Sequence, residues 1–224
     1  MDRPTSGPRR FDAVIFDCDG VLLDTERCIN GSWQQVLAEY GVELPYDEVF
    51  RQFGGFTIED NRARARQLLG DAAGEQAFDE AGVLIRRRFE AGVPLIPEAE
   101  AVLDALGVPV AVATNAPRSE LERKLRHSGL AGRFGHTVAS TDVTRGKPAP
   151  DVYLRAAELL AVAPERCAVV EDSTTGILAG VAAGMTVFGF CRDVPSDQQR
   201  AAGAVHCAES LLAIGRAIES AVAD

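Results

Sequence analysis

Short runs of apolar residues alternate along the chain with longer stretches of helical periodicity. Most of the runs are apolar at nearly every position, which is typical of strands covered on both faces of a parallel sheet. The runs occupy residues 11–16, 108–114, 136–140, 166–171, 185–190 and 204–208. This alternation predicts an α/β fold with a doubly wound, mainly parallel sheet and a Rossmann-like core.

Helices are predicted between the later strands, where apolar residues recur every three or four positions. Ala99, Val102 and Leu106 show this spacing in the first of them, and Gly184 is placed to end the fourth. The predicted helices span residues 98–106, 118–127, 151–162, 174–183 and 209–222.

One long stretch, from residue 25 to about residue 92, breaks the alternation because it contains no good strand candidate. A first helix is expected there, with Ile29, Trp33, Val36, Leu37 and Tyr40 on one face. Two more helices are expected at 57–69 and 75–90. The pattern predicts an all-helical cap domain inserted after the first strand. The predicted divisions are a core of 11–24 and 93–224, a cap of 25–92 and a flexible tail of 1–10.

Composition and charge limit the partners. The chain of 224 residues carries a formal net charge of −10, which argues against nucleic acid and anionic membrane as partners. A small anionic substrate stays possible, because a bound cation can reverse the local field. The five cysteines show no C-x-x-C spacing and no secretory signal is evident, so a reducing cytoplasm is expected. Nothing in the pattern requires assembly, and a monomer is expected.

Polar and charged residues follow several of the predicted strands. In a parallel sheet the carboxyl ends of the strands lie at one edge, where ligands bind. We therefore expect these side chains to form one site. They are Asp17 and Asp19 after the first run, Thr114 and Asn115 after the second, Lys147 in the loop after the third, and Glu171 and Asp172 after the fourth.

This set of residues suits a metal-assisted reaction on a phosphate group. Buried carboxylates repel one another unless a cation lies between them. Oxygen ligands without nearby His or Cys favour Mg²⁺, which binds one or two carboxylates and the phosphate of a substrate. Thr114 and Asn115 can donate hydrogen bonds to phosphate oxygens, and Lys147 can neutralise their charge.

Each motif taken alone has a structural explanation. Asp24 is expected to be the N-cap of the helix that begins near Thr25, and Glu26 suits its first turn. An isolated lysine is usually solvated, and an isolated Thr-Asn pair usually forms a turn. The functional interpretation depends on finding carboxylate, hydroxyl, amide and ammonium groups together, each after a successive strand of the same predicted parallel sheet.

With these motifs in this order, the chain resembles the haloacid dehalogenase superfamily. The matching elements are Asp17-x-Asp19-Gly20-Val21, Thr114-Asn115, Lys147-Pro148 and Glu171-Asp172-Ser173. The similarity covers essentially the whole chain after the first ten residues. The helical insertion is similar to the subgroup with a helical cap, which includes phosphoglycolate and sugar-phosphate phosphatases and β-phosphoglucomutase.

The resemblance implies a role for each motif residue. Asp17 would be the nucleophile that forms an aspartyl-phosphate, and Asp19 would protonate the leaving alcohol and then deprotonate water. Asp17, the carbonyl group of Asp19, and Asp172 would hold Mg²⁺, with Glu171 helping directly or through water.

The transferring phosphoryl group would be held by Thr114 and Lys147, with Asn115 assisting. The implied activity is a Mg²⁺-dependent phosphatase acting on a small phosphorylated metabolite, a sugar or polyol phosphate. A phosphosugar mutase is the alternative. The mutase carries a histidine early in the first cap helix, where this chain reads Arg27-Cys28-Ile29-Asn30.

Two other functional assignments, a phosphonatase and a non-catalytic binding protein, are disfavoured. A phosphonatase would need a cap lysine, and residues 25–92 contain none. A catalytically idle binding protein on the same fold would not need every motif residue, yet all are present.

The cap is expected to determine substrate specificity. Within 51–63, the residues predicted to contact substrate are Gly55, Phe56 and Thr57. Arg62, Arg64 and Arg66 could bind an anion, but a solvated helix face is the favoured interpretation.

Overall fold

The computed structural model describes residues 10–54, 56 and 58–221. The chain divides between Leu23 and Asp24, and again between Pro94 and Leu95, into two compact units. The core unit consists of the chain up to Leu23 and from Leu95 onward. The helical unit consists of Asp24–Pro94. Among the described helices, none is long and apolar enough to cross a membrane.

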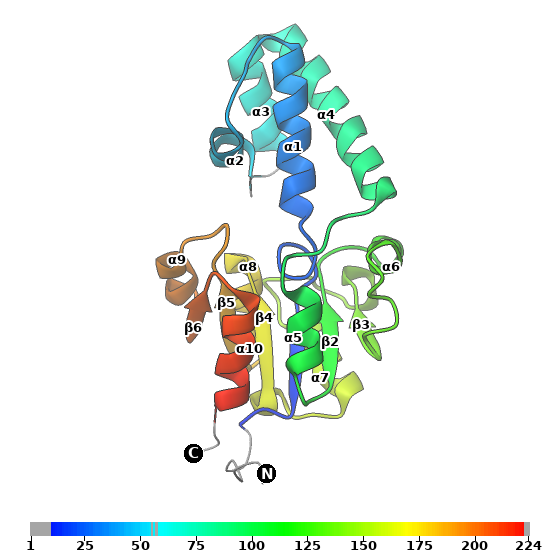
Figure 1. The fold of residues 1–224 in the computed structure, drawn as a ribbon, viewed down its shortest axis with the longest axis vertical. Helices are drawn as coiled ribbons and strands as arrows, with labels where there is room; N and C mark the ends of the chain where they lie inside the picture. The colour runs from blue at the N-terminus through cyan, green and yellow to red at the C-terminus, as the bar shows by residue number, and fades with distance from the viewer. Residues whose placement is uncertain (1–9, 55, 57, 222–224) are drawn as a thin grey trace. The chain divides into compact units, whose positions relative to one another are not determined.

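A parallel sheet runs through the core unit (Figure 1). Its strand order is β3-β2-β1-β4-β5-β6, and every neighbouring pair is parallel. The strands are β1 (Ala13–Phe16), β2 (Val110–Ala113), β3 (His136–Val138), β4 (Cys167–Glu171), β5 (Thr186–Phe190) and β6 (His206–Ala208). The fold class predicted from the sequence is confirmed.

Helices cover both faces of this sheet. Figure 1 shows α5 and α10 in front of it, while α7 and α8 pack on the opposite face around Ile15, Val169 and Tyr153. The helices are α5 (Ala99–Ala105), α6 (Arg118–His127), α7 (Asp151–Leu160), α8 (Thr174–Ala182), α9 (Ser196–Ala201) and α10 (Leu211–Ser220), with 3₁₀ turns at Ser140–Asp142 and Pro164–Arg166.

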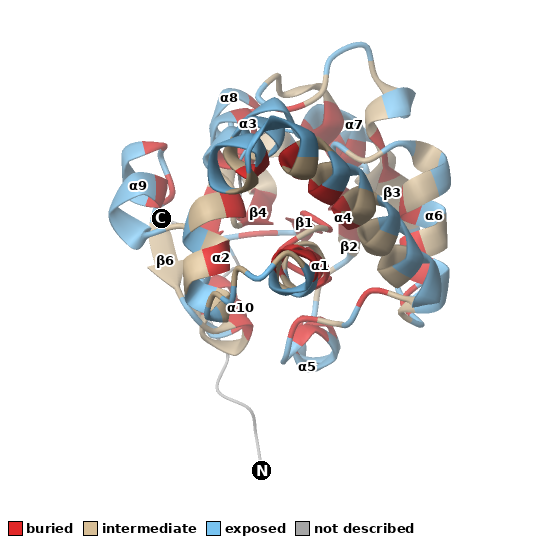
Figure 2. Cartoon of the chain, turned by 90° about the horizontal axis from the view of Figure 1, so that it is seen from above, coloured by how far each residue is buried: buried red, intermediate tan, exposed pale blue. Residues whose placement is uncertain are grey.

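The central strands have no solvated face. Every residue of β1 and β4 is buried, as the red strands in Figure 2 show. This explains why both segments are apolar at nearly every position instead of alternating. A polar residue at the end of such a strand therefore enters a site that the sheet and its helices shield from water.

The strand order reverses next to β1. From β1 the chain passes to β2 and β3 on one side, then returns to build β4, β5 and β6 on the other. A crevice forms at such a reversal, beyond the carboxyl ends of the strands. The ends of β1, β2 and β4 meet there.

The helical unit packs around its own apolar centre. Trp33 and Phe53 stack with ring centroids 4.3 Å apart, and Leu37 and Val49 are fully buried beside them. The helices are α1 (Thr25–Glu39), α2 (Tyr46–Phe53), α3 (Ile58–Leu69) and α4 (Asp71–Ala91).

The start of α1 is capped as the sequence predicts. Asp24 Oδ1 accepts a hydrogen bond from the backbone N–H of Arg27 at 3.1 Å, and Glu26 lies in the first turn. Asp24 is therefore confirmed as an N-cap residue.

The chain segments at the division between the units run beside each other. Within the core unit, the Ile96 N–H donates to the Leu22 carbonyl at 2.9 Å. Within the helical unit, the Asp24 N–H donates to the Pro94 carbonyl at 2.8 Å. The start and the end of the inserted segment are thus close together.

Several predicted boundaries differ from the structure. The helices α2 and α9 were not predicted, because each is short: α2 buries Val49 and Phe53, and the buried residue of α9 is the polar Gln199. The helix predicted at 75–90 begins at Asp71, where Gly70 with φ of 84° ends the preceding helix. The strands are shorter than the apolar runs that predicted them.

Candidate active site

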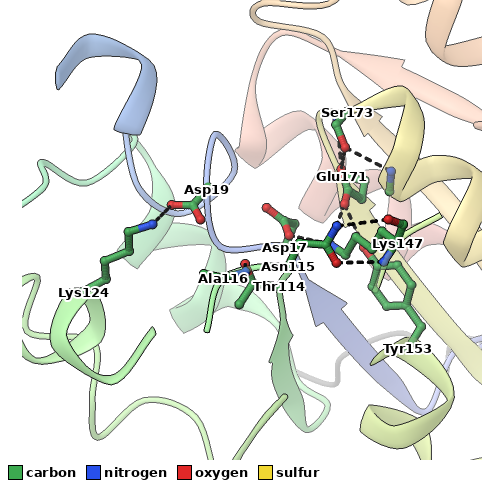
Figure 3. Close-up of polar contacts among 11 residues, drawn as sticks. Asp17, Asp19, Thr114, Asn115, Ala116, Lys124, Lys147, Tyr153, Glu171 and Ser173 are labelled. Atoms are coloured by element: carbon green, nitrogen blue, oxygen red, sulfur yellow. Dashed lines mark hydrogen bonds and ion pairs between the residues drawn. The ribbon is translucent and has the colours of Figure 1, made fainter. Parts of the chain in front are cut away.

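Asp17 lies at the carboxyl end of β1 and is buried. Its backbone N–H donates to the Val170 carbonyl at 3.0 Å, which continues the pairing of β1 with β4 by one residue. The ammonium group of Lys147 contacts Asp17 Oδ1 (Figure 3). A loop residue 130 positions away in sequence is thus brought against the first strand end.

Lys147 is held in place from other directions as well. Its Nζ donates to Glu171 Oε1 at 2.7 Å and lies 4.7 Å from the centre of the Tyr153 ring. The Tyr153 hydroxyl donates to the same Glu171 oxygen at 3.0 Å. A buried lysine is stabilised only when it is paired, and here two carboxylates and an aromatic face surround it.

The second oxygen of Glu171 is also bonded. Glu171 Oε2 accepts from the backbone N–H of Ser173 at 2.9 Å and from its hydroxyl at 3.0 Å. Burial alone would raise the pKa of Glu171, but Lys147 and the Ser173 donors lower it below the ordinary value. Glu171 is therefore a charged, fully bonded anchor for the lysine.

The pKa values of Asp17 and Asp172, unlike that of Glu171, are raised. Burial raises the pKa of Asp17 to about 7, with Lys147 opposing the shift and Glu171 and Asp19 adding to it. Burial, followed by the charges of Glu171 and Asp17, raises the pKa of Asp172 well above its ordinary value. In both cases the carboxylate form lacks sufficient positive charge nearby.

Asp172 lies against the loop that follows β1. A Cβ atom built on Gly20 would lie 2.0 Å from Asp172 Oδ2, and Gly20 has a φ of 78°. Only glycine fits both the close approach and the left-handed backbone. The end of β4 and the loop after β1 therefore meet at this position.

Thr114 and Asn115 follow β2. Thr114 Oγ1 accepts from the backbone N–H of Ala116 at 3.1 Å, and the hydroxyl group keeps its own proton as a donor. Both ends of the Asn115 amide bond the backbone of Lys147: Nδ2 donates to its carbonyl at 3.1 Å, and Oδ1 accepts from its N–H at 2.7 Å. Asn115 therefore fixes the loop that carries the lysine.

Asp19 contacts a residue that the sequence analysis missed. Lys124 of α6 donates to Asp19 Oδ1 at 2.7 Å, and its side chain is only 3% exposed (Figure 3). The signal in the sequence is its position, because Leu121 and Leu125 place it on the buried face of the helix. A charged residue on an apolar face requires a buried partner. Tyr153 was missed as well, because its contact with Glu171 depends on the tertiary structure.

The site has an excess of negative charge. Among the described residues, the carboxyl groups of Asp17, Asp19, Glu171 and Asp172 lie near the ammonium groups of Lys147 and Lys124, and Lys124 is shared with Glu120, so negative charge exceeds positive charge when all are ionised. A divalent cation with oxygen ligands would match this donor set. No cluster of three or more His, Cys, Asp or Glu side chains suited to a metal occurs among the described residues. Mg²⁺ does not need one, because waters and substrate phosphate complete its shell.

In the helical unit, Phe56 lines a cavity of about 640 Å³ together with Trp33, Phe53 and Phe78. The other predicted specificity residues, Gly55 and Thr57, lie outside the described residues. The ring of Phe56 is half exposed, so it is available for contact with a ligand.

Two of the cap arginines, Arg62 and Arg66, lie close to carboxylates. Arg66 Nε lies 3.0 Å from Asp71 Oδ1, and Arg62 Nε lies 3.8 Å from Glu75 Oε2. The Arg62 guanidinium also lies over the Phe78 ring. These contacts favour the solvated-face interpretation over anion binding.

Comparison with known families gives one consistent result. The haloacid dehalogenase-like hydrolase family matches residues 11–184. The chain is 31% identical over 189 residues to a 6-phosphogluconate phosphatase of Escherichia coli K12, covering 82% of this chain and 84% of that protein. It is 33% identical over 177 residues to a fructose-1-phosphate phosphatase of the same organism, covering 79% and 94%.

Solved structures share the fold. A haloacid dehalogenase family hydrolase from Deinococcus radiodurans R1, solved with bound phosphate and sodium, superposes with a TM-score of 0.82 at 35% identity. The match covers 95% of this chain and 99% of that one. The similarity therefore extends over both units of the chain.

Proposed function

Because the chain belongs to the haloacid dehalogenase-like hydrolase family, we propose that it is a Mg²⁺-dependent phosphatase of small phosphorylated metabolites. The reaction proceeds through an aspartyl-phosphate on Asp17. Relatives named as phosphatases of 6-phosphogluconate and fructose 1-phosphate support a sugar or polyol phosphate as substrate. We further propose that the enzyme acts as a monomer in the cytoplasm.

The observation that carries the proposal is the contact of Lys147 with both Asp17 and Glu171 at the ends of β1 and β4. A buried ammonium beside the proposed nucleophile can neutralise the oxygens of an incoming phosphoryl group. Lys147 occupies Asp17 Oδ1, so we assign Oδ2 as the attacking oxygen.

In the first step, Asp17 Oδ2 bonds to phosphorus while the bond from phosphorus to the substrate oxygen breaks. Asp19 gives its proton to that oxygen, which leaves as an alcohol. The Thr114 hydroxyl donates a hydrogen bond to a phosphoryl oxygen. Asn115 acts indirectly, because its amide holds the Lys147 loop.

In the second step, water attacks the aspartyl-phosphate and Asp19 takes its proton. The bond between phosphorus and Asp17 breaks, which returns the carboxylate and releases inorganic phosphate. The two steps restore both aspartates to their starting protonation states.

Mg²⁺ would be held by Asp17, the carbonyl group of Asp19, and Asp172. The excess of negative charge among these carboxylates supports the assignment. When bound, the cation supplies positive charge for the phosphoryl oxygens and the nucleophile. We assign Glu171 to Lys147 instead of to the cation, because both of its oxygens already accept hydrogen bonds.

The helical unit is proposed to contact the leaving group. Phe56 is the described residue that supports this role, through the aromatic cavity that it lines. Gly55 and Thr57, its neighbours in sequence, are proposed with it.

The test is a panel of phosphorylated sugars, polyols and sugar acids, assayed for phosphate release with Mg²⁺ and with EDTA. The wild type should release phosphate from at least one sugar or polyol phosphate, and only when Mg²⁺ is present. The kcat of Asp17→Asn should be lower than that of the wild type by a factor of at least about a thousand. Retained turnover in Asp17→Asn would refute the mechanism. Movement of phosphate to another carbon without free phosphate, followed by ³¹P NMR, would identify a mutase instead.

A further inference from the structure

Lys124 is a buried charged residue outside the motifs that define the proposed mechanism. It lies in the second half of α6, and its side chain is 3% exposed. Its Nζ donates to Asp19 Oδ1 at 2.7 Å and contacts Glu120 Oε1 at 2.6 Å. A lysine is almost never buried this far without a specific partner.

The neighbouring residues make Lys124 a fixed donor. Leu121 and Leu125 on the same face of α6 are buried and anchor the helix to the core. Glu120 lies one helical turn earlier, and its Oε1 forms a second ion pair with the Lys124 ammonium group. The position of Nζ is therefore defined by a helix and not by a loop.

The side chain of Asp19 is less buried than that of Asp17. Its side chain is 31% exposed, against 9% for Asp17. It lies in the turn between β1 and the helical unit, where Gly20 follows with a positive φ. The hydrogen bond from Lys124 spans 105 positions in sequence and ties this turn to α6.

We propose that Lys124 is a positioning residue for the proton transfer by Asp19. This inference rests on the proposed phosphatase function. With Lys124 on Oδ1, the second oxygen, Oδ2, is the one that delivers the proton to the leaving oxygen as the bond from phosphorus to that oxygen breaks. Loss of Lys124 lets the carboxyl group rotate, so the transfer slows although Asp19 is still present.

Substrates with different leaving groups separate this role from a structural one. An alkyl phosphate, such as the sugar phosphate found in the panel, needs a proton on its leaving oxygen. The leaving group of 4-nitrophenyl phosphate is stable as an anion and needs none. The ratio of the two kcat/KM values reports proton delivery in the first step, because kcat/KM excludes hydrolysis of the aspartyl-phosphate.

We expect Lys124→Met to lower kcat/KM about 10- to 100-fold for the alkyl phosphate and less than about threefold for 4-nitrophenyl phosphate. Asp19→Asn should show the same selectivity, and Lys124→Arg should restore most of the alkyl phosphate activity. Arg126→Met removes a basic residue from the exposed side of the same helix and should change neither value. If Lys124→Met does not fold, Lys124→Gln is measured on the same ratio.

An equal loss on both substrates, or no loss on either, would overturn the assignment of Lys124. That outcome differs from failure of the proposed function, in which the wild type itself would release no phosphate from any ester, including 4-nitrophenyl phosphate.

Discussion

Lys147 Nζ lies 2.7 Å from Glu171 Oε1, although 24 residues separate the two in sequence. Both side chains are buried, and each uses its remaining bonding capacity on other residues of the core unit. This ion pair joins the loop after β3 to the end of β4. It thereby determines where the ammonium stands relative to Asp17.

Glu171→Gln should therefore impair both stability and turnover. The amide group removes one of the two buried carboxylates that pair with Lys147, and an NH₂ group meets the two donors of Ser173. We expect a loss of roughly 3 kcal/mol in the free energy of unfolding, measured in urea. Phosphate release should fall as well, since Lys147 is no longer held. Glu165→Gln, at an exposed position before β4, is the control, and an equal effect of both changes would contradict the anchoring role.

Gly20→Ala should inactivate the enzyme. The added methyl group would lie 2.0 Å from Asp172 Oδ2, so the carboxylate must move away from the site. Gly41→Ala is a matched control, because Gly41 has a φ of 80° with no atom within 4 Å of a built Cβ. Both variants should lose about 1–2 kcal/mol of stability from the backbone alone. Only Gly20→Ala should lose turnover, and equal activity in the two variants would show that the contact with Asp172 is unimportant.

Removal of the divalent cation should change stability in a way that depends on Asp172. With Mg²⁺ at 100 times its Kd, the free energy of unfolding should rise by about 2.7 kcal/mol over the EDTA-treated protein. Asp172→Asn should greatly reduce this increase, while Asp193→Asn, in the loop after β5, should leave it intact. A thermal unfolding series over Mg²⁺ concentration measures the effect. A full increase in Asp172→Asn would exclude this residue as a ligand.

Glu98 provides a pH-dependent contribution outside the site. Its carboxylate accepts hydrogen bonds from the Leu212 N–H at 3.1 Å and the Ser210 hydroxyl at 2.8 Å, and these bonds lower the pKa of Glu98. A lowered pKa stabilises the fold above the unfolded-state value, near pH 4.3, and the stabilisation is lost as pH falls through the folded-state pKa.

Glu98→Ala should therefore cost about 0.5–1 kcal/mol at pH 7, with the difference from wild type shrinking below about pH 4. Urea unfolding at a series of pH values measures it. Glu100→Ala, at a nearby exposed position of α5, should show no such trend. A cost that stays constant down to pH 3 would rule out the carboxylate as the stabilising group.

The sheet and the strand-end residues could be predicted from sequence for a physical reason. Strands buried on both faces are apolar throughout, and parallel strands end at one edge, so Asp17, Thr114 and Glu171 must approach one another. Contacts that depend on side-chain direction could not be predicted. For example, the sequence did not indicate that both ends of the Asn115 amide bond the backbone of Lys147.

The role of Lys124 could not be predicted from the sequence either. It lies in the middle of a predicted helix, away from any strand end, and its partner Asp19 is 105 positions away. The helix α2 was missed because it is only eight residues long, too short for its apolar positions Val49 and Phe53 to predict a helix by themselves, and its tertiary contacts stabilise it.

The hydrogen bonds at the division between the units have a consequence for protein engineering. The Asp24 N–H and the Pro94 carbonyl are 2.8 Å apart, so the 71 residues from Asp24 to Pro94 begin and end at nearly the same point. A two- or three-residue turn could join Leu23 to Leu95 in their place without stretching the remaining backbone. The same junction could accept a foreign helical segment with closely spaced ends, which makes this chain a scaffold for exchanging caps between enzymes.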